Sequence, residues 1–239
     1  MKINESGRSM IEMLGVLAII GVLSVGGIAG YSKAMAKFKV NKTIDQVSHI
    51  VANTRILFSS QKNYKDLGTC TGSGGTADGK KLIIAAKLMP DGMSDDSDTY
   101  FSNAYAGQMH MCAGGRLSDS DNKAFVLAFT SIPVDACIDL ATQDWNAASG
   151  SGLVVIQVQG NEAETGISKI DSFAKITAST CGIDSTATGA DGKTSGSNLT
   201  NGDGVAYVCG VGANTEPMSI SDATKACNGV FNTIYFKFY

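Results

Sequence analysis

The sequence predicts an α+β protein in which a long N-terminal α-helix packs on an antiparallel β-sheet that is braced by disulfides. The first 67 residues contain no proline and carry apolar residues at helical spacing. Short segments with the composition of β-strands follow only after residue 100, and all six cysteines lie after residue 69. A long helix followed by a run of strands is typical of an α+β architecture, in which helix and sheet form separate layers.

The N-terminal helix is expected to have an apolar part and an amphipathic part. Residues 10–29 are apolar apart from Glu12 and small residues, and about 20 such residues are needed to span a bilayer. The run continues without proline, so we expect one helix over residues 9–67, ended by Gly68. Apolar side chains then recur in steps of three and four at Ile28, Tyr31, Met35, Phe38, Val40, Ile44, Val47, Val51 and Phe58. The later members of this stripe should pack on the sheet.

The segment after Gly68 has the composition of a small domain with many loops. Residues 71–80 are rich in glycine and are predicted to form a loop. Residues 81–89 are predicted to form a short helix that stops near Pro90.

The rest of the domain is predicted to be mostly strand and loop. Pro133 suits the first position of a helix that continues through residues 136–140. Residues 186–204 are rich in glycine and small polar residues and are predicted to be an exposed loop. Strands are predicted over residues 107–112, 124–130, 153–159, 205–209 and 234–239.

Charge is distributed unevenly along the chain. Residues 1–66 carry nine Lys and Arg against four Asp and Glu, whereas residues 67–239 carry ten against eighteen. A basic N-terminal part joined to an acidic domain indicates two regions with separate roles. We therefore expect no nucleic acid bound by the acidic domain, because phosphate contacts require Lys and Arg.

The cysteines favour disulfides over a metal site. They lie at positions 70, 112, 137, 181, 209 and 227, with no Cys-x-x-Cys pair, which favours disulfide bonds in an oxidising compartment. The two histidines, His49 and His110, are far apart in sequence, so no zinc site is expected. Six cysteines allow 15 connectivities, and the sequence alone does not choose among them.

Each candidate catalytic or cofactor motif in the sequence lacks a residue or a spacing that the motif requires. Residues 74–80 fit the GxxxxGK part of a phosphate-binding loop, but Lys81 replaces the Ser or Thr that holds Mg²⁺. Residues 192–194 read Gly-Lys-Thr, yet Ala187 stands where the first glycine is needed, so both segments are interpreted as loops. Four acidic residues could form a Ca²⁺ loop, but their spacing favours a solvated acidic loop: Asp91, Asp95, Asp96 and Asp98. No cofactor and no enzymatic activity are expected.

The N-terminal motif carries the most specific information. Gly7 ends a short polar leader, and counting from Arg8 places Glu12 fifth, just inside the apolar run. At these residues the chain resembles a type IV prepilin, a family with cleavage after that glycine and glutamate as the fifth mature residue. The mature chain would begin with Arg8, where the family usually has Phe, Met or Leu. The alternative is an ordinary signal anchor in which Glu12 only snorkels to the interface.

Two further features bear on the membrane segment. Gly26 and Gly30 form a GxxxG motif, which lets helices approach closely in membranes and suits assembly of the helix with copies of itself. Lysines 33, 37, 39 and 42 follow the apolar run, so the positive-inside rule weakly favours a cytoplasmic C-terminus. The cysteines and the family resemblance imply the opposite orientation, with the C-terminal domain in the periplasm.

The C-terminal domain resembles the type IVb branch, which includes toxin-coregulated, bundle-forming and plasmid thin pili. The matching features are an apolar segment before Pro90 and Met93, an Ala-Cys-x-x-Leu helix at residues 136–140, and a second cysteine segment before the last strand. This resemblance implies a Cys137–Cys227 disulfide. Cys70–Cys112 and Cys181–Cys209 are the two remaining expected pairs, and the resemblance does not select them.

The resemblance implies a filament subunit and its partners. We expect a prepilin in the bacterial inner membrane that is cleaved between Gly7 and Arg8 and polymerised into an extracellular pilus. Its expected parts are a leader over 1–7, a long helix over 8–67 with a membrane or filament-core part over 8–30, and a head over 68–239. The expected partners are copies of itself in a helical homopolymer, a prepilin peptidase, the inner-membrane assembly machinery, and membrane lipid before assembly. The alternatives are a minor pilin, a type II secretion pseudopilin, or a membrane-anchored periplasmic enzyme or binding protein.

Overall fold

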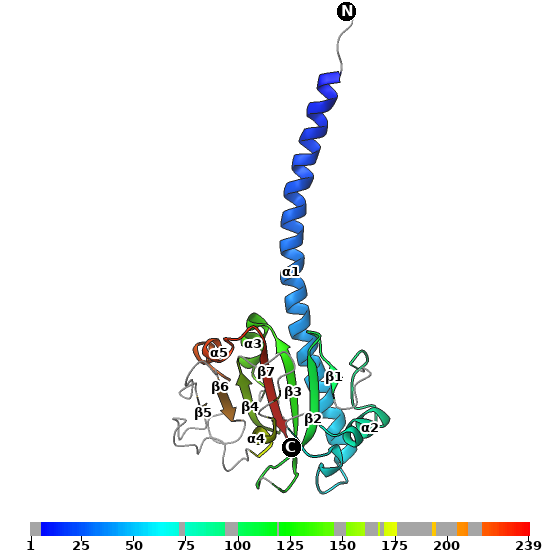
Figure 1. Cartoon of the computed structure of the whole chain (residues 1–239), viewed down its shortest axis with the longest axis vertical. Coiled ribbons are helices and arrows are strands. Elements are labelled where there is room, and N and C mark those ends of the chain that lie inside the picture. Colours follow the sequence, from blue (N-terminus) through cyan, green and yellow to red (C-terminus); the bar gives the residue numbers. More distant parts are fainter. Residues whose placement is uncertain are drawn as a thin grey trace, which may run out of the picture. The chain divides into compact units, whose positions relative to one another are not determined.

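A computed structural model describes residues 6–71, 75–93, 100–118, 120–145, 152–160, 167, 170–175, 193–194, 205–209 and 217–239. The chain divides into two compact units, Met1–Lys39 and Val40–Tyr239. One helix, α1 (Ser6–Phe58), supplies the described part of the first unit and the first element of the second (Figure 1). The long uninterrupted helix that the sequence predicts is therefore present.

The predicted end of this helix, at Leu67, was wrong. α1 ends at Phe58, and a separate 3₁₀ turn, η1 (Lys65–Leu67), follows. The reason is a tertiary contact at Tyr64, whose backbone N–H donates to the Asn122 carbonyl at 2.7 Å. The Tyr64 ring also packs between those of Phe58 and Phe125, with centroid distances of 5.1 and 5.0 Å. These contacts outweigh the modest propensity of the segment to continue as a helix.

The described strands of the second unit form one sheet in the order β1-β2-β3-β7-β4-β6-β5, and every neighbouring pair is antiparallel (Figure 1). The bounds are β1 (Phe101–Ser102), β2 (Gln108–Gly114), β3 (Ala124–Ile132), β4 (Leu153–Gln159), β5 (Lys193–Thr194), β6 (Val205–Cys209) and β7 (Asn232–Phe238). The predicted α+β class with an antiparallel sheet is confirmed, and β4 and β6 have the predicted bounds. The segment at 193–194, predicted to be loop, instead pairs with β6.

The last strand of the chain occupies the middle of the sheet. β7 pairs with β3 on one side and with β4 on the other, so that Ile234 lies opposite both Phe129 and Val158. A central strand has both edges hydrogen-bonded and both faces available for burial. β7 therefore joins the β1–β3 part of the sheet to the β4–β6 part.

Alternate residues of β7 build two hydrophobic clusters on opposite faces of the sheet. Phe236 lies in the cluster that also contains Val47 and Ile50 of α1. Tyr235 lies in the second cluster with Phe173 of α4 (Ile170–Lys175), where the two rings are 5.3 Å apart. Burying a side chain such as Ile50 contributes about 1.5–3 kcal/mol. The prediction that the later part of the apolar stripe on α1 packs on the sheet is confirmed.

The short helices differ in detail from the predicted ones. α2 (Ala77–Ala85) begins four residues before the predicted start at residue 81, because the Thr76 hydroxyl accepts a hydrogen bond from Gly79 N and caps the first turn. Residues 77–80 are therefore helical and not the predicted loop. Pro133 is the N-cap of α3 (Val134–Ala141), one position before the predicted one, with its backbone extended at φ −62° and ψ 154°. α4 and α5 (Ile220–Ala226) were not predicted, since neither exceeds two turns.

Lys237 lies in the centre of the sheet with no exposed surface. Its Nζ donates to the Ala174 carbonyl at 2.7 Å, near the end of α4. Burial lowers the pKa of Lys237 to about 7, and the charge of Asp121 opposes this change. The folded protein therefore disfavours the ammonium form of a side chain that the unfolded chain protonates readily.

The free energy of unfolding should accordingly rise with pH through the range in which Lys237 differs between the two states. The unfolded lysine titrates near its ordinary pKa of 10.5 and the folded one near 7, so stability is lost as pH falls between these values and changes no further below about 7. The slope approaches 1.4 kcal/mol per pH unit at most. Denaturant unfolding between pH 7 and 9, followed by the fluorescence of the single tryptophan, should show this slope in the wild type and not in Lys237→Met. An unchanged slope in the variant would assign the pH dependence to other groups.

Candidate functional site

The N-terminal part of α1 presents apolar side chains to its surroundings. Of its large apolar residues, Met35 is half-buried, and the others are more than half exposed: Met10, Ile11, Met13, Leu14, Val16, Leu17, Ile19, Ile20, Val22, Leu23, Val25, Ile28, Tyr31 and Phe38. α1 is long and apolar enough to cross a membrane by length and composition. Ile28, Tyr31 and Phe38, which the sequence placed on the same stripe as Val40, are thus not part of the core. Exposed apolar surface on this scale indicates a partner outside the subunit.

Glu12 is the acidic residue of this segment. It lies in α1 with its side chain exposed, and between Ser6 and Ile44 the sequence has no other Asp or Glu. Gly7 and Arg8 lie in the first turn of α1. Arg8 and Glu12 are four residues apart, a spacing that places two residues on the same face of a helix.

The glycines of α1 have no packing role within the subunit. A Cβ atom added at Gly26 or Gly30 would meet no described atom within 4 Å, and the same holds for Gly15, Gly21 and Gly27. Each glycine in a helix costs about 1 kcal/mol relative to alanine. The described fold of the subunit offers nothing that offsets this cost, whereas close approach of a second helix would favour small residues at these positions.

Two disulfides are present in the described part of the head. Cys137 of α3 is joined to Cys227, the C-cap of α5, with a Cα–Cα distance of 5.9 Å. This is the pair that the resemblance implies. Cys70 is joined to Cys112 of β2 with a Cα–Cα distance of 5.2 Å.

The third expected pair, Cys181–Cys209, falls largely outside the described residues. Cys181 lies outside them, and Cys209 is described only as the last residue of β6. That pairing stays a prediction.

The remaining motifs give no catalytic or metal site among the described residues. Lys80 lies in α2, and its buried ammonium donates to the Tyr100 carbonyl and lies 4.6 Å from the centroid of the Phe101 ring. It is therefore a packing residue and not the lysine of a phosphate loop. No group of three or more His, Cys, Asp or Glu in the described segments could hold a metal ion. Of the candidate Ca²⁺ residues, Asp91 is described, whereas Asp95, Asp96 and Asp98 lie outside the described residues.

Comparison with known families decides the affiliation of the chain. The family model described as PilS N terminal matches residues 37–195, which is more than half of the sequence. The chain belongs to the PilS family. This membership confirms the resemblance to type IVb pilins that the N-terminal motif and the head motifs indicated. The protein is thus a pilin, a structural subunit and not an enzyme.

Two individual proteins are similar to this pilin in sequence at low identity. Two relatives, from Escherichia coli O111:H- and Escherichia coli O127:H6, are each described as the major structural subunit of bundle-forming pilus. Each is 24% identical over 176 residues, covering 74% of this chain and 83% of the relative.

Two crystal structures are also similar to this pilin. TcpA, a type IV pilin from Vibrio cholerae El Tor biotype, shares 14% identity over 85% of this chain and 99% of its own, with a TM-score of 0.44. A type IVb pilin from Salmonella typhi shares 16% identity over 84% of this chain and 97% of its own, with a TM-score of 0.40.

Proposed function

We propose that this pilin is made as an inner-membrane prepilin, cleaved after Gly7, and polymerised through the N-terminal part of α1 into an extracellular filament. The observation that supports this most is the exposed apolar surface of α1, which contains a single acidic residue, Glu12. Before assembly, lipid would cover this surface. In the filament, the same helices of neighbouring copies would cover it and replace the lipid.

The proposal includes a major structural role and the partners that such a role requires. Both Escherichia coli relatives are described as major structural subunits, which favours a major pilin over a minor pilin or pseudopilin. A prepilin peptidase would act at Gly7, and inner-membrane assembly machinery would extract the subunit from lipid. Gly26 and Gly30 would allow close approach of neighbouring helices, because the absent side chains leave open space on one face of α1.

Cleavage between Gly7 and Arg8 tests the proposal directly. Assembled subunits should have the intact mass of residues 8–239, and Gly7→Val should accumulate as the uncut precursor in the membrane. The reason is steric, since a β-branched side chain at the scissile bond restricts the backbone and blocks approach of a peptidase.

Gly15→Val is the matched control for the cleavage experiment. It makes the same change in α1 at a site where an added Cβ meets no described atom within 4 Å. This variant should be cleaved like the wild type. Filaments in which residues 1–7 are retained would contradict the proposed processing.

A further inference from the structure

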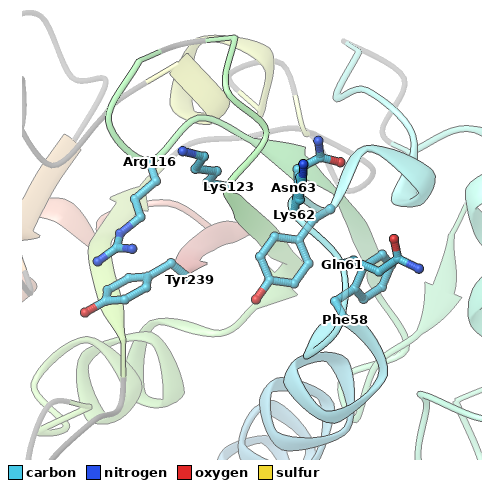
Figure 2. A pocket seen from close by; sticks show the side chains of 8 residues that line it. Phe58, Gln61, Lys62, Asn63, Arg116, Lys123 and Tyr239 are labelled. Atoms are coloured by element: carbon cyan, nitrogen blue, oxygen red, sulfur yellow. The ribbon is translucent and has the colours of Figure 1, made fainter.

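The second compact unit contains an open pocket of about 190 Å³ beside the end of α1. Figure 2 shows the Arg116 side chain lying against the Tyr239 ring on one side, with Lys62 and Asn63 on the other side and Lys123 between them. The lining residues come from three separate parts of the chain: Phe58, Gln61, Lys62, Asn63, Tyr64, Arg116, Lys123 and Tyr239. All of them belong to the second compact unit.

The pocket is positively charged although the domain around it is acidic. Three of its eight lining residues are cations, Lys62, Arg116 and Lys123, and none of the eight is Asp or Glu. Residues 40–239, the unit that contains the pocket, carry fourteen Lys and Arg against twenty Asp and Glu, so a local group of cations without a lining carboxylate is unexpected by composition. A concave site lined by one sign of charge concentrates ions of the opposite sign.

One loop holds two of the cations in place. The Asp121 carboxylate accepts hydrogen bonds from the backbone N–H groups of Arg116 at 2.8 Å and Lys123 at 3.0 Å, and further ones from Leu117 and Ser118. These bonds lower the pKa of Asp121 even though burial opposes the shift. The carboxylate therefore organises the backbone that carries both cations, and its hydrogen bonds go to that backbone.

The aromatic walls are also fixed. The Arg116 guanidinium carbon lies 3.4 Å from the centroid of the Tyr239 ring. The backbone of the same residue is held by Arg55, whose Nε donates to the Tyr239 carbonyl at 2.8 Å. Tyr64 is held by its ring contacts and by its backbone bond to Asn122. A site whose walls are fixed before a ligand arrives loses little entropy on binding.

We propose that this pocket binds a small organic anion, whose phosphate or carboxylate is held by Lys62, Arg116 and Lys123. The volume is below the range of about 300–1,000 Å³ that is typical of pockets for drug-sized ligands, so the ligand is small. Arginine and lysine together provide the donors that an oxyanion requires. The amides of Gln61 and Asn63 provide donors and acceptors for a polar, hydroxyl-bearing body.

Calorimetric titration of the full chain in a non-ionic detergent tests this assignment with glucose 6-phosphate and with glucose. The phosphorylated sugar should bind and the neutral sugar should not, because the cations recognise the oxyanion. Inorganic phosphate should compete with glucose 6-phosphate, and the affinity should fall as salt is raised. Failure of glucose 6-phosphate to bind, equal binding of glucose, or failure of inorganic phosphate to compete would overturn the proposal.

A matched pair of variants separates the effect of the pocket from that of the overall charge of the second unit. Lys62→Gln/Arg116→Gln/Lys123→Gln removes the three pocket cations and should weaken binding about tenfold or more. Lys81→Gln/Lys87→Gln/Lys225→Gln removes the same number of exposed charges outside the pocket and should leave the affinity unchanged. Unchanged tryptophan fluorescence would show that both variants are folded. An equal loss of affinity in the two variants would overturn the proposal, because it would reduce the effect to net charge.

Discussion

Glu12→Ala is expected to reduce filament yield at least a hundredfold while the head stays folded. We propose in addition that, once cleavage has created an amine at Arg8, Glu12 of one subunit pairs with that amine of a neighbour in the filament core. Removing one member of a buried ion pair leaves an uncompensated charge and costs about 3–5 kcal/mol. Since 1.4 kcal/mol corresponds to about a tenfold change in an equilibrium constant, this cost is a factor of about 10² to 4 × 10³ for each subunit added.

The variant separates assembly from membrane insertion. A carboxylate within a membrane helix is itself unfavourable, so its removal should leave insertion intact or improve it. The test therefore measures two amounts in Glu12→Ala and in the wild type: the filaments sheared from the cell surface and the precursor in the membrane. We expect the filament fraction to disappear and the membrane fraction to persist.

Two variants make the test specific for charge. Glu12→Gln keeps the shape of the side chain and removes its charge, so it should fail like Glu12→Ala, whereas Glu12→Asp should assemble partly. Head folding is checked by the Cys70–Cys112 and Cys137–Cys227 bonds in non-reducing peptide maps. Normal filament yield from Glu12→Gln would refute the ion pair and leave Glu12 as a residue that only reaches the interface.

Some parts of the fold could be predicted because local pattern and tertiary structure agree. The absence of proline and the regular apolar spacing specify α1. β4 has the predicted bounds because it is rich in β-branched residues and has Gly152 and Gly160 on either side. The Cys137–Cys227 pair was reached only through the family resemblance. Sequence spacing contains no information about which of 15 connectivities forms.

Other parts depend on contacts between residues far apart in sequence. α1 ends at Phe58 because Tyr64 bonds to Asn122, a contact that no local pattern signals. Lys237 looks like an ordinary exposed residue of a final strand, and it is buried because β7 is placed between β3 and β4. The basic pocket is formed by the segment after α1, the loop before β3 and the end of the chain. In the sequence, the cations of this pocket lie in two segments that are far apart, and no local pattern groups them.

Removing the Cys137–Cys227 bond is expected to cause the largest loss of head stability among changes to the described disulfides. The bond closes a loop of 90 residues in sequence, against 42 for Cys70–Cys112. In the chain-entropy model the longer loop corresponds to about 4–5 kcal/mol and the shorter one to about 4 kcal/mol. Measured losses for native disulfides are typically about 2–5 kcal/mol. The difference from loop length alone is thus under about 1 kcal/mol.

The structure gives a reason why the loss of stability on removing Cys137–Cys227 should exceed that on removing Cys70–Cys112 by more than loop length implies. α5 has seven residues, too few to be stable as an isolated helix, and Cys227 ties its end to α3. After residues 228–231 the chain enters β7, and Asn232 Nδ2 donates to the Ile132 carbonyl at the end of β3. Loosening α5 therefore releases the entry to the central strand of the sheet. Cys70 lies outside the helices and strands, before α2, and is only partly buried.

Denaturant unfolding of two paired variants measures this effect. Cys137→Ala/Cys227→Ala and Cys70→Ala/Cys112→Ala each remove one bond without leaving a free thiol. Trp145 reports on the region concerned, because its ring lies 4.7 Å from that of Phe236 and its Nε1 donates to the Leu140 carbonyl of α3. The first variant should unfold at the lower denaturant concentration and give fewer filaments. If the second variant is the less stable one, the proposed role of the α3–α5 bond in holding β7 is wrong, and stability then depends on the face of the sheet that contains Cys112.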